Sequence, residues 1–312
     1  MRMRKSRFVF ANRLSTKKLN VEKISSMLSF IKSVVYVTRS LKKIRSIPVS
    51  AETKKKIEKA CYQVFCFTPK SKKSGDIDLA GYKVRYCHFG SFEYVFNELF
   101  VQNEYQLNVS TDSPVILDCG SNIGLTSIYF QLLWPSAKIT AFEPDQQAFE
   151  CLKENVEVNK LNNITIHNIA LAGKEGELKF YSEQNVSGSL TSSLSQSSGS
   201  VEVVVKADKL SNYIDSKIDI LKIDIEGAED EVMEELRQTG KLANIEQIMM
   251  EYHHHMDGNT DKLSTMLGLL EQQGFGYQIE GAMIRPPELG SPQNLIIYAY
   301  NKSLIASRQN KD

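Results

Sequence analysis

Beyond residue 114, short apolar runs alternate with stretches whose apolar residues recur at helical spacing. Apolar strands that alternate with amphipathic helices are typical of a parallel sheet covered by helices on both faces. The apolar runs lie at 115–117, 139–142, 164–169, 218–223 and 245–250, and the amphipathic stretches at 145–159, 228–236 and 263–273. Two later runs, at 277–280 and 295–300, are close enough to pair antiparallel. The pattern predicts an α/β fold with a mostly parallel sheet and an antiparallel edge strand.

The first part of the chain has a different pattern. Apolar residues at helical spacing among lysines predict one or two amphipathic helices over 17–47, and a polar, lysine-rich stretch at 69–78 is typical of a linker. Residues 80–86 alternate like a strand, and 91–105 have helical spacing. The Ser- and Gly-rich stretch at 182–200 predicts a mobile loop, which can lie over the cleft. We expect three parts: a basic, largely helical N-terminal extension over 1–70, a main domain over 80–302 and a C-terminal tail over 303–312.

The N-terminal extension and the remainder carry opposite charge. Residues 1–60 hold 17 Lys and Arg against 3 Asp and Glu, whereas 61–312 hold 21 against 34. Clustered cations attract an anionic membrane surface, nucleic acid or the acidic remainder of the chain, and a solvated extension is an equal alternative. The extension lacks the interleaved aromatic residues of single-strand binders. We therefore predict no nucleic-acid partner and, at most, peripheral membrane contact.

Cysteine usage and hydropathy bear on the compartment. The five cysteines are odd in number and none belongs to a Cys-x-x-Cys pair, which favours reduced thiols over a disulfide framework or a zinc site. The apolar candidate segment at 24–38 is interrupted by Lys32 and is shorter than the ~20 residues of a spanning helix. We therefore expect a cytoplasmic protein without a transmembrane segment.

The sharpest motif is a glycine turn after the first parallel strand. The chain reads Leu-Asp-Cys-Gly-Ser-Asn-Ile-Gly over 117–124, and such glycines let the backbone turn tightly where ligands bind in an open α/β sheet. A dinucleotide fingerprint would have glycine where this chain has Asp118, and a carboxylate there repels a pyrophosphate. It suits a positively charged nucleoside without phosphate, such as S-adenosylmethionine. The candidate cofactor-binding residues here are Asp118, Gly120, Ser121, Asn122 and Gly124.

Residues after the next two strands extend this nucleoside site. Glu143 ends the second strand, and an acid at that point of nucleotide-binding folds accepts hydrogen bonds from the ribose hydroxyls. Asn168 and Ala170 follow the third strand, where Asn168 can face the adenine edge or simply form a turn. Phe142 and Ile169 can enclose the adenine ring or belong to the core. We expect Glu143, Asn168 and Ala170 to contact the cofactor.

A second dense motif follows the fourth strand. It reads Asp-Ile-Glu-Gly-Ala-Glu from Asp224 to Glu229. Residues two apart on an extended backbone share a face, so a strand that continues through Ile225 would point both Asp224 and Glu226 into the cleft. Glu229 lies in the first turn of a helix, where an acid favours the positive dipole end. The fifth strand adds Glu251 and His253 to the same rim. The candidate catalytic residues are Asp224, Glu226 and His253.

Carboxylates gathered at this rim suit two chemistries. They can bind a divalent cation such as Mg²⁺, with Asp224 and Glu251 as ligands, or one can act as a general base with a raised pKa. The ordinary pKa of His253 also suits a base. Either arrangement would help methyl transfer to a hydroxyl. The run of three histidines from His253 does not predict a metal cluster, because adjacent side chains on an extended strand point oppositely.

Together these motifs resemble the FkbM family of S-adenosylmethionine-dependent methyltransferases over about 80–302. The Lys-Ile-Asp-Ile-Glu-Gly-Ala-Glu block is the distinctive part. The resemblance implies the Rossmann-like, seven-stranded methyltransferase fold and O-methylation of a sugar, glycan or secondary metabolite, and Cys119 is a mild departure from it. It puts the following residues on cofactor positions: Asp118, Gly120, Asn122, Gly124 and Glu143. It puts Asp224 and Glu226 at the reaction site.

Two alternatives belong to other classes of protein. A NAD-dependent oxidoreductase would share the sheet, but Asp118 and the missing third glycine of the fingerprint oppose it. A non-catalytic nucleoside-binding module would have less need of Glu143 and Asp224. We expect a small-molecule or glycan hydroxyl as the acceptor and leave its identity and the oligomeric state open, because acceptor pockets are built from loops.

Overall fold

The computed structural model describes residues 27–69, 71–105, 107–183, 200–254, 262–281 and 293–309. Its centre is a seven-stranded sheet of order β11-β12-β10-β9-β3-β4-β5, in which β12 runs antiparallel to both neighbours and the other pairs are parallel. The strands are β3 (Val115–Cys119), β4 (Lys138–Phe142), β5 (Ile164–His167), β9 (Ile218–Ile223), β10 (Ile245–His254), β11 (Phe275–Glu280) and β12 (Gln293–Asn301). The predicted fold class is confirmed; the antiparallel strand lies one place inside the edge, which β11 forms.

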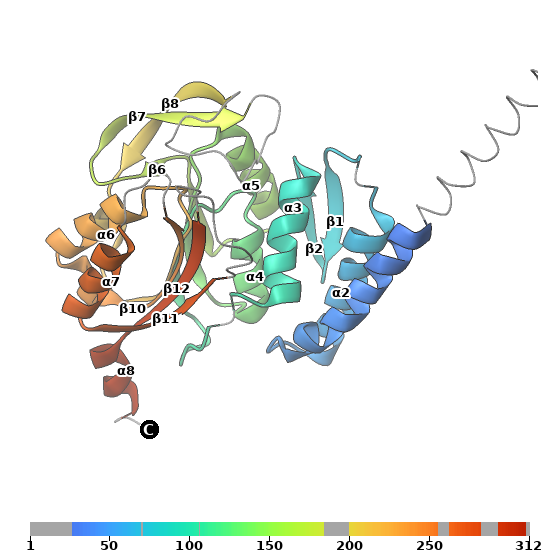
Figure 1. The fold of residues 1–312 in the computed structure, drawn as a ribbon, viewed down its shortest axis with the longest axis horizontal. Coiled ribbons are helices and arrows are strands. Elements are labelled where there is room, and N and C mark those ends of the chain that lie inside the picture. Colours follow the sequence, from blue (N-terminus) through green and yellow to red (C-terminus); the bar gives the residue numbers. More distant parts are fainter. Residues whose placement is uncertain are drawn as a thin grey trace, which may run out of the picture.

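Helical layers cover both faces of this sheet (Figure 1). Successive residues of β3 face opposite layers, because side chains alternate along a strand: Ile116 packs with α4 and α5, and Leu117 with α6 and α7. The central strand β9 is buried along its whole length, as a parallel strand between two layers should be. The helices are α4 (Leu125–Leu133), α5 (Gln146–Val158), α6 (Glu229–Gln238) and α7 (Leu263–Gln272), with a short η4 (Lys241–Asn244) before β10.

A three-stranded sheet is inserted between β5 and β9 and lies at the top of Figure 1. Its strands, in spatial order β6-β8-β7, are β6 (Ala170–Leu171), β7 (Gly176–Glu183) and β8 (Ser200–Asp208), and η3 (Leu210–Tyr213) follows. The loop predicted over 182–200 is strand at both ends, while its centre, 184–199, lies outside the described residues. This small sheet was not predicted.

The N-terminal extension packs against the main sheet domain. Val37, Ile44 and Ile57 are fully buried in the same cluster as Phe92 and Ile116, so the core crosses the boundary predicted between residues 70 and 80. Of the alternatives left open for the extension, a solvated one therefore does not hold for residues 27–69. The region consists of a helix over 27–46, α2 (Ala51–Tyr62), η1 (Gln63–Phe67), β1 (Gly75–Leu79), β2 (Tyr82–Tyr86), α3 (Phe89–Phe96) and η2 (Asn97–Gln102).

Two boundaries near the ends of the main domain differ from the sequence prediction. Residues 75–78 were expected in a linker but form most of β1, where Ile77 and Leu79 are buried. Residues 302–309 were expected mainly in a tail but form α8 (Lys302–Gln309). In the described ranges no helix is both long and apolar enough to cross a bilayer. The described residues include all five cysteines, and no disulfide joins them.

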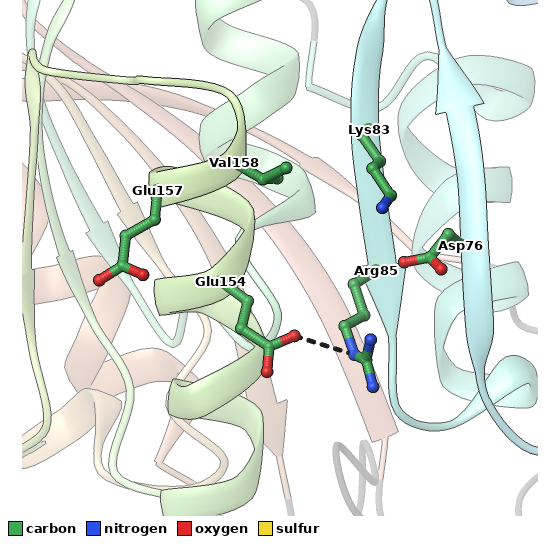
Figure 2. Close-up of a pocket in the computed structure, with 6 residues that line it drawn as sticks. All are labelled: Asp76, Lys83, Arg85, Glu154, Glu157 and Val158. Carbon is green, nitrogen blue, oxygen red and sulfur yellow. Dashed lines mark ion pairs between the residues drawn. The ribbon is translucent and has the colours of Figure 1, made fainter.

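A cavity of about 410 Å³ lies between the β1-β2 hairpin and α5 (Figure 2). Its lining residues are Asp76, Lys83, Arg85, Glu154, Glu157 and Val158. Opposite charges face each other across it, and Arg85 Nε lies 2.9 Å from Glu154 Oε2. None of its lining residues is among the predicted site residues, so the cavity is not part of the candidate site as predicted.

Candidate active site

The glycine turn after β3 has the backbone geometry that the sequence predicted. Gly120, Asn122 and Gly124 all have φ in the left-handed region, at +80°, +48° and +81°. A Cβ on Gly120 would lie 1.7 Å from the carbonyl oxygen of Asp224, so only glycine allows the turn after β3 to touch the end of β9. A Cβ on Gly124 would lie 2.5 Å from Leu152 Cδ1. The two predicted halves of the site are therefore in contact.

Glu143 faces this turn from the end of β4. Its Oε2 accepts a hydrogen bond from the Asn122 backbone N–H at 2.8 Å, and its Oε1 accepts one from the Asp145 N–H at 2.8 Å. Burial raises the pKa of Glu143 to about 8. A carboxylate oxygen has two lone pairs, so each oxygen of Glu143 can accept one more hydrogen bond. This arrangement fits a ribose diol, which offers two donors.

Three other predicted cofactor residues are engaged in the fold itself. Ser121 is buried; its hydroxyl donates to the Asp118 carbonyl at 2.7 Å and accepts from the Phe142 N–H at 3.1 Å. The Asn168 amide donates to the carbonyl of Glu143 at 2.9 Å, so it holds the turn after β4. Ala170 is buried in β6. Their direct contact with the cofactor stays a prediction.

Phe142 and Ile169, proposed as an adenine enclosure or as core, both belong to the buried cluster on the α6 and α7 side of the sheet. The ring of Phe142 stacks on His167 with centroids 5.3 Å apart and meets Tyr213 edge-on at 4.8 Å. In this structure the two residues are core.

Asp118 is paired with a buried lysine that the sequence analysis did not consider. Lys222 lies opposite Asp118 in the register of β3 and β9, with its Nζ 3.6 Å from Asp118 Oδ1. The other oxygen of Asp118 accepts a hydrogen bond from Ser127 at 2.6 Å. From the sequence, Asp118 was expected to interact with the positive groups of the cofactor. Because Asp118 is fully buried, the structure instead gives it an internal cation.

Lys222 ties the cofactor turn to the reaction site. Its ammonium donates to the carbonyls of Cys119 and Gly120, at 3.1 and 2.7 Å, and lies 3.5 Å from Asp224 Oδ2. Burial lowers the pKa of Lys222, but the charges of Asp224 and Asp118 outweigh burial and raise it. The signal in the sequence was a lone lysine in an otherwise buried strand, since a buried cation needs partners.

His253 lies among carboxylates from three segments. Its Nδ1 is 2.9 Å from Glu229 Oε1, and its Nε2 is 3.3 Å from Glu226 Oε2 and 4.0 Å from Glu251 Oε1. Burial lowers the pKa of His253, but the hydrogen bond to Glu229 and the surrounding carboxylates outweigh burial and raise it to about 10. His253 is thus a cation at neutral pH, and the ordinary pKa that suggested a base does not apply to it.

Glu229 does more than complement the dipole of α6. It is buried, and its carboxylate accepts hydrogen bonds from the Gly227 N–H at 3.1 Å and the Ile225 N–H at 3.3 Å, in addition to its contact with His253. Glu226 has φ +55°, so the chain turns sharply between β9 and α6. Glu229 therefore fixes this turn and the His253 ring relative to each other.

Two carboxylates at the rim, Glu226 and Glu251, have raised pKa values. Burial, followed by the charge of Asp224, raises the pKa of Glu226 to about 8 and that of Glu251 to about 7. Ligand atoms of Asp224, Glu226 and His253 lie within 4.8 Å of one another, so this group has the spacing of a cation site, whereas the sequence analysis had paired Asp224 with Glu251. A protonated His253 cannot act as a ligand, and a cation would first have to displace that proton.

Glu98 is a further acid near this rim and was not predicted. It lies in η2 and is buried, and burial followed by the charges of Glu251 and Glu104 raises its pKa to about 9. Its carboxyl is hydrogen-bonded with Tyr94. The sequence contained a signal, because Glu98 comes three positions after Val95 on the apolar face of the predicted helix.

A glycine turn after the first parallel strand, a buried acid after the second and carboxylates after the fourth, on a sheet of this order, define an S-adenosylmethionine-dependent methyltransferase. A family match narrows this class further. Residues 118–277 match the methyltransferase FkbM domain, and the chain belongs to that family.

Relatives of known name share about a quarter of the aligned residues. Methyltransferase 1 of Beauveria bassiana is 26% identical over 221 residues, which cover 63% of this chain and 86% of that protein. The 2-O-methyltransferase NoeI of Sinorhizobium fredii is 29% identical over 138 residues, or 38% of this chain and 56% of that protein. Among solved structures, the FkbM methyltransferase of Methylobacillus flagellatus has a TM-score of 0.43 at 14% identity, covering 87% of this chain and 61% of that chain.

Proposed function

We propose that this methyltransferase acts on oxygen and methylates a hydroxyl of a sugar, glycan or other small molecule. The observation that carries the proposal is the position of Glu226, a carboxylate with a raised pKa next to the turn that Gly120 and Asp224 share. A general base works best when its pKa lies near the working pH, and a hydroxyl must lose its proton as its oxygen bonds to the methyl carbon. The name of the distant relative NoeI supports the same reaction.

Residues of this chain fit the ribose of the cofactor and its approach to the backbone. Glu143 would hold the ribose, because its two oxygens keep free lone pairs and are fixed by backbone donors at Asn122 and Asp145. The glycine turn would let the cofactor approach the backbone. Asp118 and Lys222 would act indirectly: Lys222, paired with Asp118, holds the glycine turn through its hydrogen bond to the Gly120 carbonyl. When bound, S-adenosylmethionine supplies an electrophilic methyl group.

The side chains of this chain then have separate tasks. Glu226 would take the proton of the acceptor hydroxyl, and bound S-adenosylmethionine would supply the methyl group and leave as S-adenosylhomocysteine. His253 stays protonated between Glu229 and Glu226 and orients the Glu226 carboxylate. Asp224, whose position is fixed by Lys222, orients the acceptor. This assigns Asp224 and Glu226 as catalytic residues and His253 as a positioning residue.

The first experiment tests the cofactor. Calorimetric titrations with S-adenosylmethionine, S-adenosylhomocysteine and NAD should show binding of the first two and none of NAD. Incubation with labelled S-adenosylmethionine and a panel of sugars and other hydroxyl compounds should then place the label on oxygen. Label found on nitrogen or carbon would overturn the O-methyltransferase proposal, and binding of NAD alone would return the chain to the oxidoreductase class.

A second experiment separates a carboxylate base from a divalent cation. With a base at Glu226, EDTA leaves turnover unchanged and Asp224→Asn abolishes turnover with cofactor binding retained. With Mg²⁺ bound by Asp224 and Glu251, EDTA stops the reaction and magnesium restores it. We favour the base, because His253 already supplies a fixed positive charge to these carboxylates. Reduced thiols are consistent with a cytoplasmic location, which we also propose.

A further inference from the structure

We propose that the N-terminal half of the helix over 27–46 docks onto an anionic lipid surface. This part of the helix leaves large apolar side chains exposed although the rest of the helix is well packed. The exposed fractions are 57% for Met27, 51% for Leu28, 47% for Ile31 and 41% for Val35. In contrast, Val37 and Ile44 on the same helix are fully buried.

The exposed apolar residues form one stripe along the helix. Met27, Ile31 and Val35 follow one another at intervals of four residues, and Leu28 is seven residues before Val35, so all lie on one side. The opposite side faces the protein, where Val37 and Ile44 are buried. The helix is thus packed on one side and exposes apolar side chains on the other. An exposed apolar patch of this kind is typical of an interaction site.

Cations surround this stripe. Exposed Lys32 lies beside it, and Arg39 and Lys42 continue it along the same side of the helix toward the C-terminal end. Residues 27–69 hold nine Lys and Arg and two Glu in total. Apolar side chains flanked by Lys and Arg are the pattern of a helix that lies in the interface of an anionic bilayer, with apolar groups below the headgroups and cations at their level.

The charge favours a lipid surface over a second copy of this chain. A symmetric contact between two such stripes would bring Lys32, Arg39 and Lys42 of both copies together, and like charges oppose such a contact. An anionic bilayer instead offers negative charge and an apolar interior along one plane. The active-site rim at Asp224 and Glu226 takes no part in this proposal, so the proposal does not depend on the reaction.

The test uses the full chain and sedimentation with vesicles. One set of vesicles contains phosphatidylcholine alone, and the other contains about a third phosphatidylglycerol. The wild-type protein should sediment with the anionic vesicles only, and high salt should release it because salt screens the cations. Val35→Asp should lower the partition coefficient about tenfold or more, since it removes an inserted apolar group and adds a negative charge.

Val158→Asp is the matched control. Val158 is 50% exposed on α5, beside the cavity of Figure 2, and so has the same chemistry and similar exposure away from the stripe. It should bind anionic vesicles like the wild type, and unfolding curves should show both variants folded. Absence of vesicle binding, equal binding to both kinds of vesicle, or equal loss in both variants would overturn the proposal. So would a wild-type dimer that Val35→Asp converts to a monomer without any vesicle binding.

Discussion

The side-chain amide of Asn155 on α5 pairs with both backbone groups of Arg85 on β2. Its Oδ1 accepts from the Arg85 N–H at 2.7 Å, and its Nδ2 donates to the Arg85 carbonyl at 3.0 Å and to the Ile123 carbonyl at 2.8 Å. One helical turn later, Asn159 pairs in the same way with the N–H and carbonyl of Lys83, both at 2.8 Å. Two asparagines thus hydrogen-bond the free edge of the hairpin as a neighbouring strand would, and Asn155 alone extends this pairing to the glycine turn.

Because only Asn155 reaches the glycine turn, replacing Asn155 or Asn159 should affect stability in both cases but cofactor binding in only one. Asn155→Ala should lower the free energy of unfolding by about 3 kcal/mol, because three hydrogen bonds in a buried or part-buried setting lose their partner. It should also weaken S-adenosylhomocysteine binding through the loosened turn. Asn159→Ala should cost about 1 kcal/mol and leave binding unchanged. Urea unfolding and calorimetry measure the two effects. Equal losses of affinity in both variants would show that Asn155 has no special link to the turn.

A second prediction concerns the charge on His253. Glu229→Gln keeps the shape of the side chain but removes the negative charge 2.9 Å from Nδ1, so the pKa of His253 should fall from about 10 toward its ordinary value. An NMR titration of the imidazole measures this shift. Glu231→Gln, in the same first turn of α6 but exposed, should leave the titration unchanged. A His253 that titrates near 6.5 in the wild type would contradict the proposed fixed cation.

The pH dependence of turnover tests Glu226. A base acts only when ionised, so the rate should rise with pH through about 8, the pKa to which burial raises Glu226. Glu226→Gln should lower kcat about 100-fold and abolish this rise while leaving the affinity for S-adenosylhomocysteine unchanged. Glu234→Gln, on the exposed side of α6, is the control and should behave like the wild type. A rise that persists in Glu226→Gln would assign the base to another group, with Glu251 as the next candidate.

The sequence predicted those site residues whose role follows from their place at the end of a strand. Glu143 and Asp224 were identifiable because β4 and β9 are apolar runs with an acid directly after them. Lys222 was not, since its partner Asp118 is distant in the chain and only the register of β3 and β9 brings them together. The contact between Glu229 and His253 joins α6 to β10 in the same way.

Local composition misled the sequence analysis elsewhere in the chain. The lysines at 72 and 73 made 69–78 look like a linker and obscured the alternation of Ile77 and Leu79 in β1. The pKa of His253 could not be inferred from residue type, because it depends on the number of carboxylates that the fold gathers around the ring. Pattern thus predicts elements and strand ends, whereas charge states depend on contacts between elements.

Glu143 should control cofactor affinity. Glu143→Gln replaces one acceptor oxygen by a donor, so a backbone N–H at Asn122 or Asp145 loses its partner and the ribose loses one acceptor. Affinity for S-adenosylhomocysteine should fall roughly tenfold or more. Because ribose hydroxyls favour the ionised carboxylate, affinity in the wild type should rise with pH through about 8, and this rise should be absent in the variant. Calorimetric titrations with S-adenosylhomocysteine at several pH values across that range measure both effects. Glu157→Gln, on the exposed side of α5, is the control.

The last prediction links Glu98 to the stability of the fold. Its pKa is about 9 in the folded protein and 4.5 ordinarily, so between these values the folded state keeps a proton that the unfolded state has lost. Stability must then fall as pH rises through this window. Glu98→Gln resembles the protonated form and removes this contribution to the slope, so its advantage over the wild type should grow from pH 6 to pH 9. Glu104→Gln, at a half-buried acid whose pKa is also raised by burial, is the comparison. Urea unfolding at several pH values measures the slopes, and parallel slopes for Glu98→Gln and wild type would mean that Glu98 is ionised in the folded protein.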